Sequence, residues 1–333
     1  GSGSTAGYNG GFTVGSADGN WSLTMNGLLQ TVWVKQDLGT PGTDTDGGFA
    51  APNNWMNFSG TIAGDYSYDV RYNWDTRTTE FANGTLNLGD GWDLTMGTYR
   101  VHTNRLQMVD DQNQTVLGNS ENAFVGNGVS LSYSGDDIRF WADMMNSSNG
   151  TGSVNDGDYN MNLRAEYMVE GTWSQFDQFT SADGGAAGTL IGLSYASITN
   201  NGLAADTVFT VAGLGALDGD SMWTVDAQMS FGGSNLYVAY TDYSDDGAGV
   251  FGDFDVLHVE GGYYLNSDWE LYAAYDAFDP TTAGAGFNAV TVGLNNYWAG
   301  QNAKWTIEWS EVDPDLAGAT DLTQFATQLQ FYF

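Results

Sequence analysis

Hydrophobic and polar residues alternate with a period of two along almost the whole chain. Segment 159–170 is the clearest example, because apolar residues occupy its odd positions while Asn, Arg and Glu occupy most of its even positions. The same alternation recurs at 66–75, 269–276 and 304–309. Strict alternation predicts β-strands with two unlike faces. No segment shows a sustained helical period with capping residues, so the chain is predicted to be all-β.

The connections between the predicted strands alternate in length. Short turns occur at places such as 89–91 and 232–234, whereas long polar stretches occur at 100–126 and 146–158. Short turns at one end and long loops at the other are typical of a transmembrane, antiparallel up-and-down β-barrel with periplasmic turns and outer loops.

The alternating segments number 18, of which two, 173–179 and 208–213, are weak. Removing both keeps the number even, so we predict 16 strands and keep 18 as the alternative. The predicted organisation is a periplasmic N-terminal segment, 1–20, followed by a single transmembrane barrel, 21–333. We also expect 1–10 to be a processed start from which any export signal has been removed.

Alternation alone also describes a soluble β-sandwich whose apolar face is buried. Three further features favour a membrane barrel. The first is that the polar faces carry charges at mid-strand, and the second is that the last strand places alternate apolar residues on one face up to Phe333. The third is a set of aromatic residues at predicted strand ends, as interfacial girdles require: Trp21, Trp33, Trp55, Tyr99, Tyr133, Trp223, Phe231 and Trp298.

The charge balance excludes several classes of function. The chain has 41 acidic and 8 basic residues, a formal net charge of -33 and no Cys. Nucleic acid is therefore an improbable partner, since phosphate binding needs basic residues, and disulfide or thiolate chemistry is absent. The two histidines, His102 and His258, lack a nucleophile and an orienting partner in any recognisable spacing. We predict a protein that is not an enzyme.

Several stretches carry a family resemblance: the C-terminal strand 325–333, the N-terminal stretch 11–21, and shorter motifs at 171–177, 261–265 and 292–297. They resemble bacterial outer-membrane porins of the phosphate-selective porin-like family, including its planctomycete-type members. The resemblance implies a Gram-negative outer-membrane protein, a homotrimer of 16-stranded barrels in contact with the lipid bilayer and lipopolysaccharide. It also implies that the loop after the fifth strand folds into the lumen, and that 173–185 is a longer periplasmic connection. Phosphate selectivity does not carry over, because a chain with so few Lys and Arg cannot line its pore with them.

The long stretch at 100–126 follows the fifth predicted strand and is the candidate constriction loop. It carries Arg100, Arg105, Asp110, Asp111 and Glu121. Inward-facing Arg on the early strands and acidic residues on the loop and opposite wall would produce a transverse field. Local ion pairs, such as Arg71 with Asp69 or Asp75, are the alternative. The other candidate pore-lining residues, on the polar faces of strands, are Arg71, Arg139, Arg164, Glu166, Asp226, Glu260, Glu270, Lys304 and Glu308.

These features predict a diffusion porin that passes small hydrophilic solutes and ions. Because carboxylates dominate the later strands, we expect a preference for cations. A surface adhesin or structural barrel with an occluded lumen is one alternative. A soluble Ca²⁺-binding β-protein is another, for which the acidic loop offers Asp245, Asp246, Asp253 and Asp255, although a solvated acidic loop explains these residues as well. No cofactor is expected apart from such a structural Ca²⁺.

Overall fold

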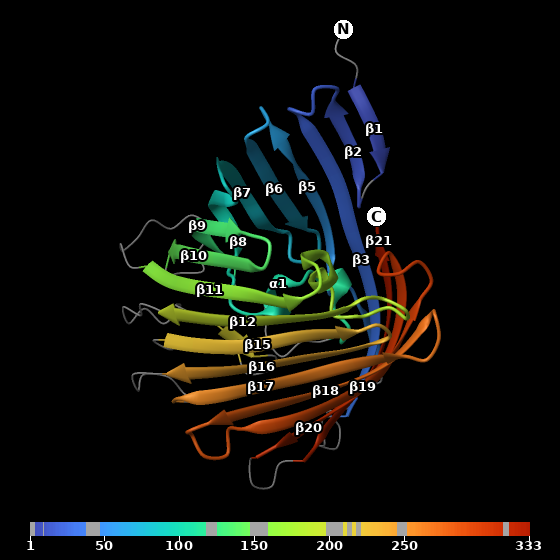
Figure 1. Ribbon diagram of the computed structural model, residues 1–333. Coiled ribbons are helices and arrows are strands. Elements are labelled where there is room, and N and C mark those ends of the chain that lie inside the picture. The colour runs from blue at the N-terminus through green and yellow to red at the C-terminus, as the bar shows by residue number, and fades with distance from the viewer. Residues whose placement is uncertain are drawn as a thin grey trace.

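The computed structural model describes residues 4–8, 10–37, 47–117, 125–146, 159–197, 209–211, 215–217, 221–244, 252–315 and 320–333. Antiparallel strands form a closed barrel, in which the first barrel strand pairs with the second and also with the last (Figure 1). In chain order the barrel strands are β3 (Ser22–Asp37), β5 (Asn54–Ile62), β6 (Tyr66–Asn73), β7 (Thr78–Gly89), β8 (Trp92–Arg100), β9 (Val125–Ser134), β10 (Ile138–Asn146), β11 (Tyr159–Glu170), β12 (Ala187–Ser197), β15 (Ser221–Phe231), β16 (Ser234–Ser244), β17 (Phe254–Tyr264), β18 (Trp269–Pro280), β19 (Phe287–Tyr297), β20 (Ala303–Pro314) and β21 (Leu322–Tyr332).

The barrel therefore has the 16 strands that the sequence predicts, and both weak segments lie outside it. Trp173–Asp177 is a 3-10 helix, η2. Residues Phe209–Val211 (β13) and Gly215–Leu217 (β14) pair only with each other, in a separate two-stranded sheet. The short strand β4 (Gly48–Ala50) pairs with β3 on the edge opposite β21, beyond the residues of β3 that pair with β5.

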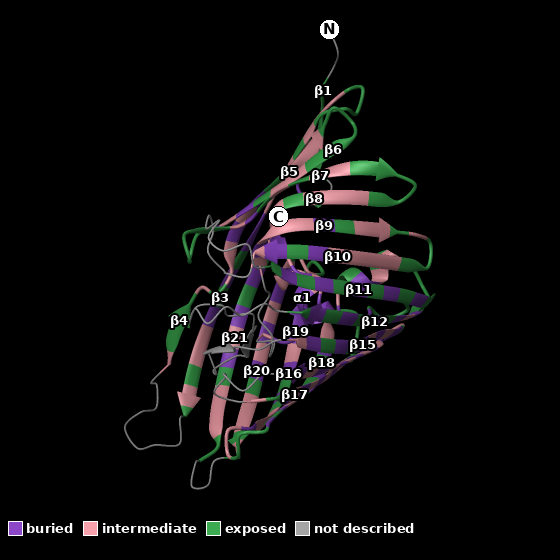
Figure 2. Cartoon of the chain, turned by 90° about the vertical axis from the view of Figure 1, so that its left-hand side faces the viewer, coloured by how far each residue is buried: buried purple, intermediate pink, exposed green. Residues whose placement is uncertain are grey.

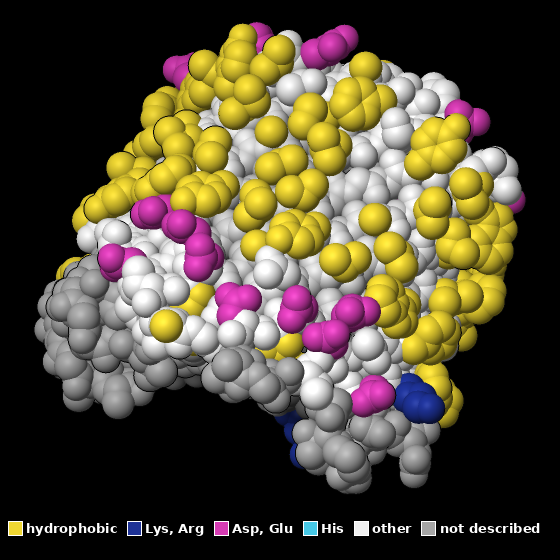
Figure 3. All heavy atoms as spheres, turned by 90° about the horizontal axis from the view of Figure 1, so that it is seen from below, with side chains coloured by type: hydrophobic (Ala, Val, Ile, Leu, Met, Phe, Trp, Pro, Cys, Tyr) yellow, Lys and Arg dark blue, Asp and Glu magenta, His cyan; other side chains and the backbone are white. Residues whose placement is uncertain are grey.

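The burial of the strands is the reverse of that in a water-soluble β-sandwich. Along β11 the odd, apolar positions are exposed and the even, polar positions are buried up to Met168. Leu163 has 46% of its surface exposed, whereas its neighbour Arg164 has 1%. Figure 2 shows the same alternation on neighbouring strands. On one outer face, hydrophobic side chains form a broad band, and Asp and Glu gather along its edge (Figure 3).

The predicted aromatic girdle is correct at some positions and wrong at two. Trp21, Phe231 and Trp298 are more than half exposed. Trp55 and Tyr99 are instead 1% and 5% exposed, because both side chains belong to the inward-facing set of their strands. A strand-end aromatic residue can lie on either face, and only its parity within the strand decides which.

One end of the barrel carries the tight turns. The β7–β8 turn is an example: Asp90 and Gly91 both have positive φ values, 52° and 83°, as a two-residue turn between twisted strands requires. The C-terminus lies at this end and is joined to β3, where the amides of Gly27 and Phe333 each donate to the other's carbonyl at 2.8 and 3.0 Å. The other end carries the long loops, including the described parts of 38–53 and 101–124.

The N-terminal segment forms a β-hairpin at the short-turn end. Strands β1 (Ser4–Tyr8) and β2 (Phe12–Ser16) pair with each other, and β2 pairs with the first residues of β3. Figure 1 shows this hairpin projecting past the C-terminus of β21. The prediction that 1–20 stands apart from the barrel, on the periplasmic side, remains a prediction. Within the described residues, no helix has the length and hydrophobicity needed to cross a membrane.

Candidate functional site: the barrel lumen

The loop between β8 and β9 folds into the lumen. Its described part, 101–117, contains α1 (Arg105–Met108) and η1 (Asp111–Asn113), and Figure 1 shows α1 inside the barrel. Asn104 is the N-cap of this helix, and its side chain accepts a hydrogen bond from the Gln107 amide at 3.1 Å. We call residues 101–117 the outer insert, because they enter from the long-loop end. These residues belong to the loop after the fifth strand, which the family resemblance places in the lumen.

Late strands hold the end of the outer insert. Lys304 Nζ donates to the Gln114 carbonyl at 2.7 Å, and the Leu117 amide donates to Glu308 Oε2 at 2.9 Å. On β19, Asn295 Nδ2 donates to the Thr115 carbonyl at 3.0 Å. The charged groups of Lys304 and Glu308 therefore hold the loop backbone instead of facing water.

Early strands hold the middle of the outer insert through Asp110. Its carboxylate accepts two hydrogen bonds from the Arg71 guanidinium, at 3.1 and 3.2 Å, and lies 3.7 Å from Arg100. Trp55 packs flat against Arg71, with 3.8 Å between the guanidinium carbon and the ring centroid. Burial raises the pKa of Asp110, but the attraction of Arg71 and Arg100 outweighs it and leaves this pKa below the usual 3.8.

A second segment enters the lumen from the short-turn end. Residues 171–186 join β11 to β12 and include η2, and we call them the inner insert. Phe176 and Phe179 are at most 1% exposed. Thr180 Oγ1 donates to Glu270 Oε1 at 2.8 Å, which attaches the inner insert to β18. This connection is much longer than the other turns at that end, as the family resemblance implies, but its position in the lumen was not predicted.

The two inserts contact each other inside the barrel. Asn113 Nδ2 donates to the Asp177 carbonyl at 2.9 Å, and the Phe179 amide donates to the Asn113 carbonyl at 3.2 Å. Arg105 of α1 also donates to the Phe176 carbonyl. Leu106 and Val109 pack in one apolar cluster with Phe179 and with the β16 residues Tyr237 and Ala239. The inserts thus form one continuous body against the later strands.

A buried charge network lies beneath this body. Arg164 Nη1 is 2.7 Å from Asp226 Oδ2, and Arg164 Nη2 is 2.8 Å from Glu166 Oε1. Arg105 Nη1 lies 3.5 Å from the same Glu166 oxygen. All four side chains are at most 5% exposed, so these ion pairs exist out of contact with bulk water. Arg164 does face inward, as predicted, but it does not face a water-filled pore.

The predicted acidic wall is covered in the same way, and this corrects the expectation that it faces the pore. Asp226, Glu260, Glu270 and Glu308 are each at most 4% exposed. The carboxylate of Glu270, for example, accepts hydrogen bonds from three side chains, those of Thr180, Asn235 and Tyr297. The sequence placed these residues on the correct face of each strand, but it gave no sign that the inserts would cover them.

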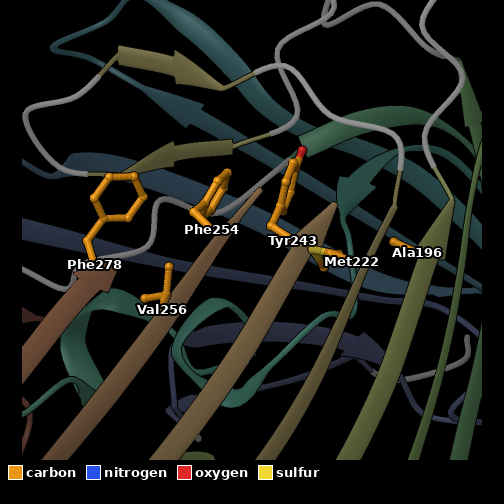
Figure 4. Packing of buried hydrophobic residues seen from close by; sticks show 6 residues of the cluster. All are labelled: Ala196, Met222, Tyr243, Phe254, Val256 and Phe278. Carbon is orange, nitrogen blue, oxygen red and sulfur yellow. The ribbon is translucent and has the colours of Figure 1, made fainter. Parts of the chain in front are cut away.

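Apolar side chains fill the inner face of the same wall toward its long-loop end. Figure 4 shows six of them projecting from adjacent strands. Tyr243 and Phe254 stack with 4.4 Å between ring centroids. The cluster, from β12, β15, β16, β17 and β18, comprises Ala196, Met222, Tyr243, Phe254, Val256 and Phe278.

Open space in the lumen occurs along the early strands, β6–β10. Two cavities of about 420 and 300 Å³ adjoin there and share part of their lining. We call them together the side passage. Their shared lining residues are Arg100, His102, Met108, Asp110 and Trp141.

Arginines concentrate at the side passage. The chain has six arginines, and four of them line the two cavities: Arg71, Arg100, Arg105 and Arg139. Asp69, Asp110 and Asp177 are the carboxylates in the lining. The predicted transverse field between separate walls is therefore replaced by direct ion pairs within one wall and the outer insert. Local ion pairs were the alternative, although Arg71 pairs with Asp110 and not with Asp69 or Asp75.

The remaining candidate residues have different outcomes. Asp111 lies in the outer insert, where its carboxylate accepts from Trp55 Nε1 at 3.3 Å. Glu121, Asp245 and Asp246 lie outside the described residues. Asp253 and Asp255 are among the described residues. Nowhere in the described residues do three or more His, Asp or Glu form a group able to hold a metal ion. Ca²⁺ binding stays a prediction.

The lumen also contains functional candidates that the sequence analysis missed. His102 Nδ1 lies 3.1 Å from Asp143 Oδ1, and the His102 ring stacks on Trp141 at 5.1 Å. Arg139 lies over the ring of Trp173, 4.1 Å from its centroid. Parity within the strands would have placed Trp141 and Asp143 inside the barrel, but the contact with Trp173 depends on the fold of the inner insert.

Comparison with known proteins identifies the fold. No family model and no curated protein matches the chain. Among solved structures, the anion-selective porin from Comamonas acidovorans is similar over 94% of this chain and 100% of its own, with a TM-score of 0.66 and 12% identity. The outer membrane channel DcaP of Acinetobacter baumannii matches over 94% and 98%, with a TM-score of 0.63 and 11% identity. The trimer form of OmpT, an outer membrane protein of Vibrio cholerae, matches over 94% and 99%, with a TM-score of 0.59 and 14% identity. The chain therefore has the 16-stranded barrel fold of bacterial outer-membrane porins, and the more specific resemblance to phosphate-selective, planctomycete-type porins is not confirmed.

Proposed function

We propose that the protein is a diffusion porin of a bacterial outer membrane that passes small hydrophilic solutes and ions through the side passage. The proposal assigns it no enzymatic activity. Its outer insert narrows the lumen from the long-loop end, and its inner insert narrows the lumen from the short-turn end.

The observation that carries the membrane location is the reversed burial of the strands. Soluble monomers rarely expose continuous apolar patches larger than a few hundred Å². Here apolar side chains such as Leu193 (57%), Tyr167 (52%) and Leu163 (46%) are exposed on one strand face after another, and polar side chains are buried behind them. A closed barrel with this pattern satisfies its backbone internally and presents a lipid-compatible surface.

Two arguments support a channel rather than a sealed barrel. The side passage holds about 420 and 300 Å³ of space in two adjoining cavities, lined mostly by polar and charged residues. In addition, the barrel matches, over nearly its whole length, structures described as porins and outer membrane channels.

The cation preference predicted from the sequence now rests on a weaker basis. It assumed that Asp226, Glu260, Glu270 and Glu308 face the permeating ions, yet these side chains are buried. Charges lining the side passage are nearly balanced, with four Arg against three Asp. The formal net charge of -33 is what remains in favour of cations, and the preference should then weaken as salt screens that charge. We therefore propose a weakly selective porin.

The same proposal includes assembly and surroundings. The family resemblance implies a homotrimer in contact with lipopolysaccharide, and one similar structure is a trimer form. Chemical cross-linking of the purified protein in detergent should then yield a trimer band, and this band should persist after heat denaturation because the cross-links are covalent. Only monomers at all protein concentrations would contradict this part of the proposal.

The test of channel function is reconstitution into a planar lipid bilayer. We expect discrete, voltage-independent conductance steps, and a reversal potential under a KCl gradient that lies close to zero. A large reversal potential of either sign would contradict weak selectivity. A folded, inserted protein without conductance would favour the alternative of a structural barrel or adhesin with an occluded lumen.

A further inference from the structure

We infer that the side passage contains a binding site for small organic anions, in which Arg139 is the binding group. The inference deepens the proposed function, on which it rests, because it names a class of solute that the passage retains.

The arginines that line the side passage have different partners. Arg71 and Arg100 lie within ion-pair distance of Asp110, and Arg105 within that of Glu166. Arg139 is the exception, since no carboxylate of the described residues lies within 4 Å of its guanidinium. This is unusual in a chain where acidic residues outnumber basic ones by 41 to 8.

Arg139 is nevertheless held in place and partly removed from water. Its guanidinium lies over Trp173, and Trp173 Nε1 in turn donates to the carbonyls of Gly135 and Asp136 at 3.0 and 2.9 Å. The Nε of Arg139 is buried and has no hydrogen-bond partner among the described atoms. A partly desolvated cation with unused donors attracts an anionic acceptor, because charge-assisted bonds are roughly twice as strong as neutral ones.

The cavity next to Arg139 has the size and the lining for a small organic acid. It measures about 420 Å³, and a planar guanidinium can bind a carboxylate through two parallel hydrogen bonds. Asn113 lines the same cavity, as do His102 and Trp141, whose stacked rings supply a flat apolar face for a carbon skeleton. Asp110 and Asp177 also line it and would repel an anion, so binding should be weak enough for the solute to leave.

The experiment measures block of the ion current by citrate in a planar bilayer at constant KCl concentration. Citrate should reduce the single-channel current at concentrations where glucose, a neutral solute, leaves it unchanged. In Arg139→Gln the citrate concentration for half block should rise roughly tenfold, the effect of losing one charge-assisted hydrogen-bonding group. Arg139→Lys keeps the charge but loses the planar guanidinium. Its citrate concentration for half block should lie between those of the unmodified protein and Arg139→Gln.

Arg77→Gln is the matched control, because it removes the same charge from an exposed turn between β6 and β7 that lines neither cavity. Its half-block concentration should equal that of the unmodified protein. A difference in gel mobility between unheated and heated samples of each variant confirms that the variant is folded. Equal block of unmodified protein and Arg139→Gln, or block by glucose as strong as that by citrate, would overturn the site while leaving the porin proposal intact. No conductance from folded, unmodified protein would instead overturn the porin proposal.

Discussion

Asp110 and Arg71 join the middle of an inserted loop to the barrel wall by a bidentate ion pair, with oxygen–nitrogen distances of 3.1 and 3.2 Å. The two residues are 39 positions apart in the chain, and Arg100 approaches the same carboxylate at 3.7 Å. This contact sets one boundary of the open space, because Asp110 lines both cavities of the side passage.

Asp110→Asn should loosen the outer insert, because it removes the charge that holds two guanidiniums against the loop. Breaking a charged hydrogen bond and leaving the partner unpaired costs about 1–3 kcal/mol. We expect larger fluctuations of the open-channel current and a higher mean conductance in single-channel recordings. Asp65→Asn, in the exposed β5–β6 turn, is the control and should leave both unchanged. Identical recordings from the two variants would show that Asp110 does not hold the loop.

Acid should have little effect on this contact above about pH 4. The pKa of Asp110 is lowered from 3.8, so its ion pairs stabilise the folded loop fully above that value. That stabilisation is lost only as the pH falls below 3.8 through the lowered pKa of the folded state. Current fluctuations measured between pH 7 and about pH 4 should therefore stay constant. A rise in fluctuations near pH 5, absent in Asp110→Asn, would contradict the lowered pKa.

Arg164→Leu should strongly destabilise the barrel, contrary to what an inward-facing residue in a wet pore would do. It leaves Asp226 and Glu166 buried, and breaking a buried ion pair costs about 3–5 kcal/mol. Urea-induced unfolding in lipid vesicles measures the loss. The double variant Arg164→Met, Asp226→Asn keeps Glu166 for Arg105 and should recover part of the stability. No recovery would mean that Asp226 is not the residue left unpaired.

Leu163→Arg tests the opposite face of the same strand. Leu163 is 46% exposed, and a charged residue at the lipid midplane costs roughly 2–4 kcal/mol. Insertion of this variant into preformed vesicles should fail or slow down. A second substitution of an inward-facing residue, such as Asp226→Asn, should not restore insertion. Normal insertion of this variant would contradict the assignment of the outward face to lipid.

Replacing the inner insert, 171–186, by a two-residue turn like Gly232–Gly233 should widen the passage. It removes the contacts of Phe176 with Arg105 and of Thr180 with Glu270, and it uncovers the charges behind them. We expect higher single-channel conductance and entry of larger sugars in a liposome-swelling assay. Conductance equal to that of the unmodified barrel would place the inner insert outside the conduction path.

The barrel could be predicted well from the sequence because the alternation of apolar and polar residues within each strand shows which residues face outward and which face inward. Alternation in 159–170 placed Leu163 outward and Arg164 inward, and both placements are correct. The same rule applied along the chain gave 18 segments, and setting aside the two weak ones left the 16 strands of the barrel. These results need only local information, since a residue's face depends on its parity within one strand.

The lumen was predicted less well because its contents depend on segments without a period. Lys304 and Glu308 face inward as expected, but their partners belong to 112–117, nearly 200 residues earlier. Asp110 was recognised as part of a constriction loop, whereas its pairing with Arg71 depends on how that loop folds. An irregular loop carries no alternation from which its side-chain directions could be read, so the covered acidic wall could not be foreseen.

Single-channel recording of the purified, folded protein in a planar bilayer shows whether the side passage conducts. The unmodified barrel should give discrete conductance steps, and the variant lacking the inner insert should give larger steps of the same kind. Complete absence of steps from the unmodified protein, with steps only in the shortened variant, would show that the two inserts seal the lumen and that the side passage does not conduct.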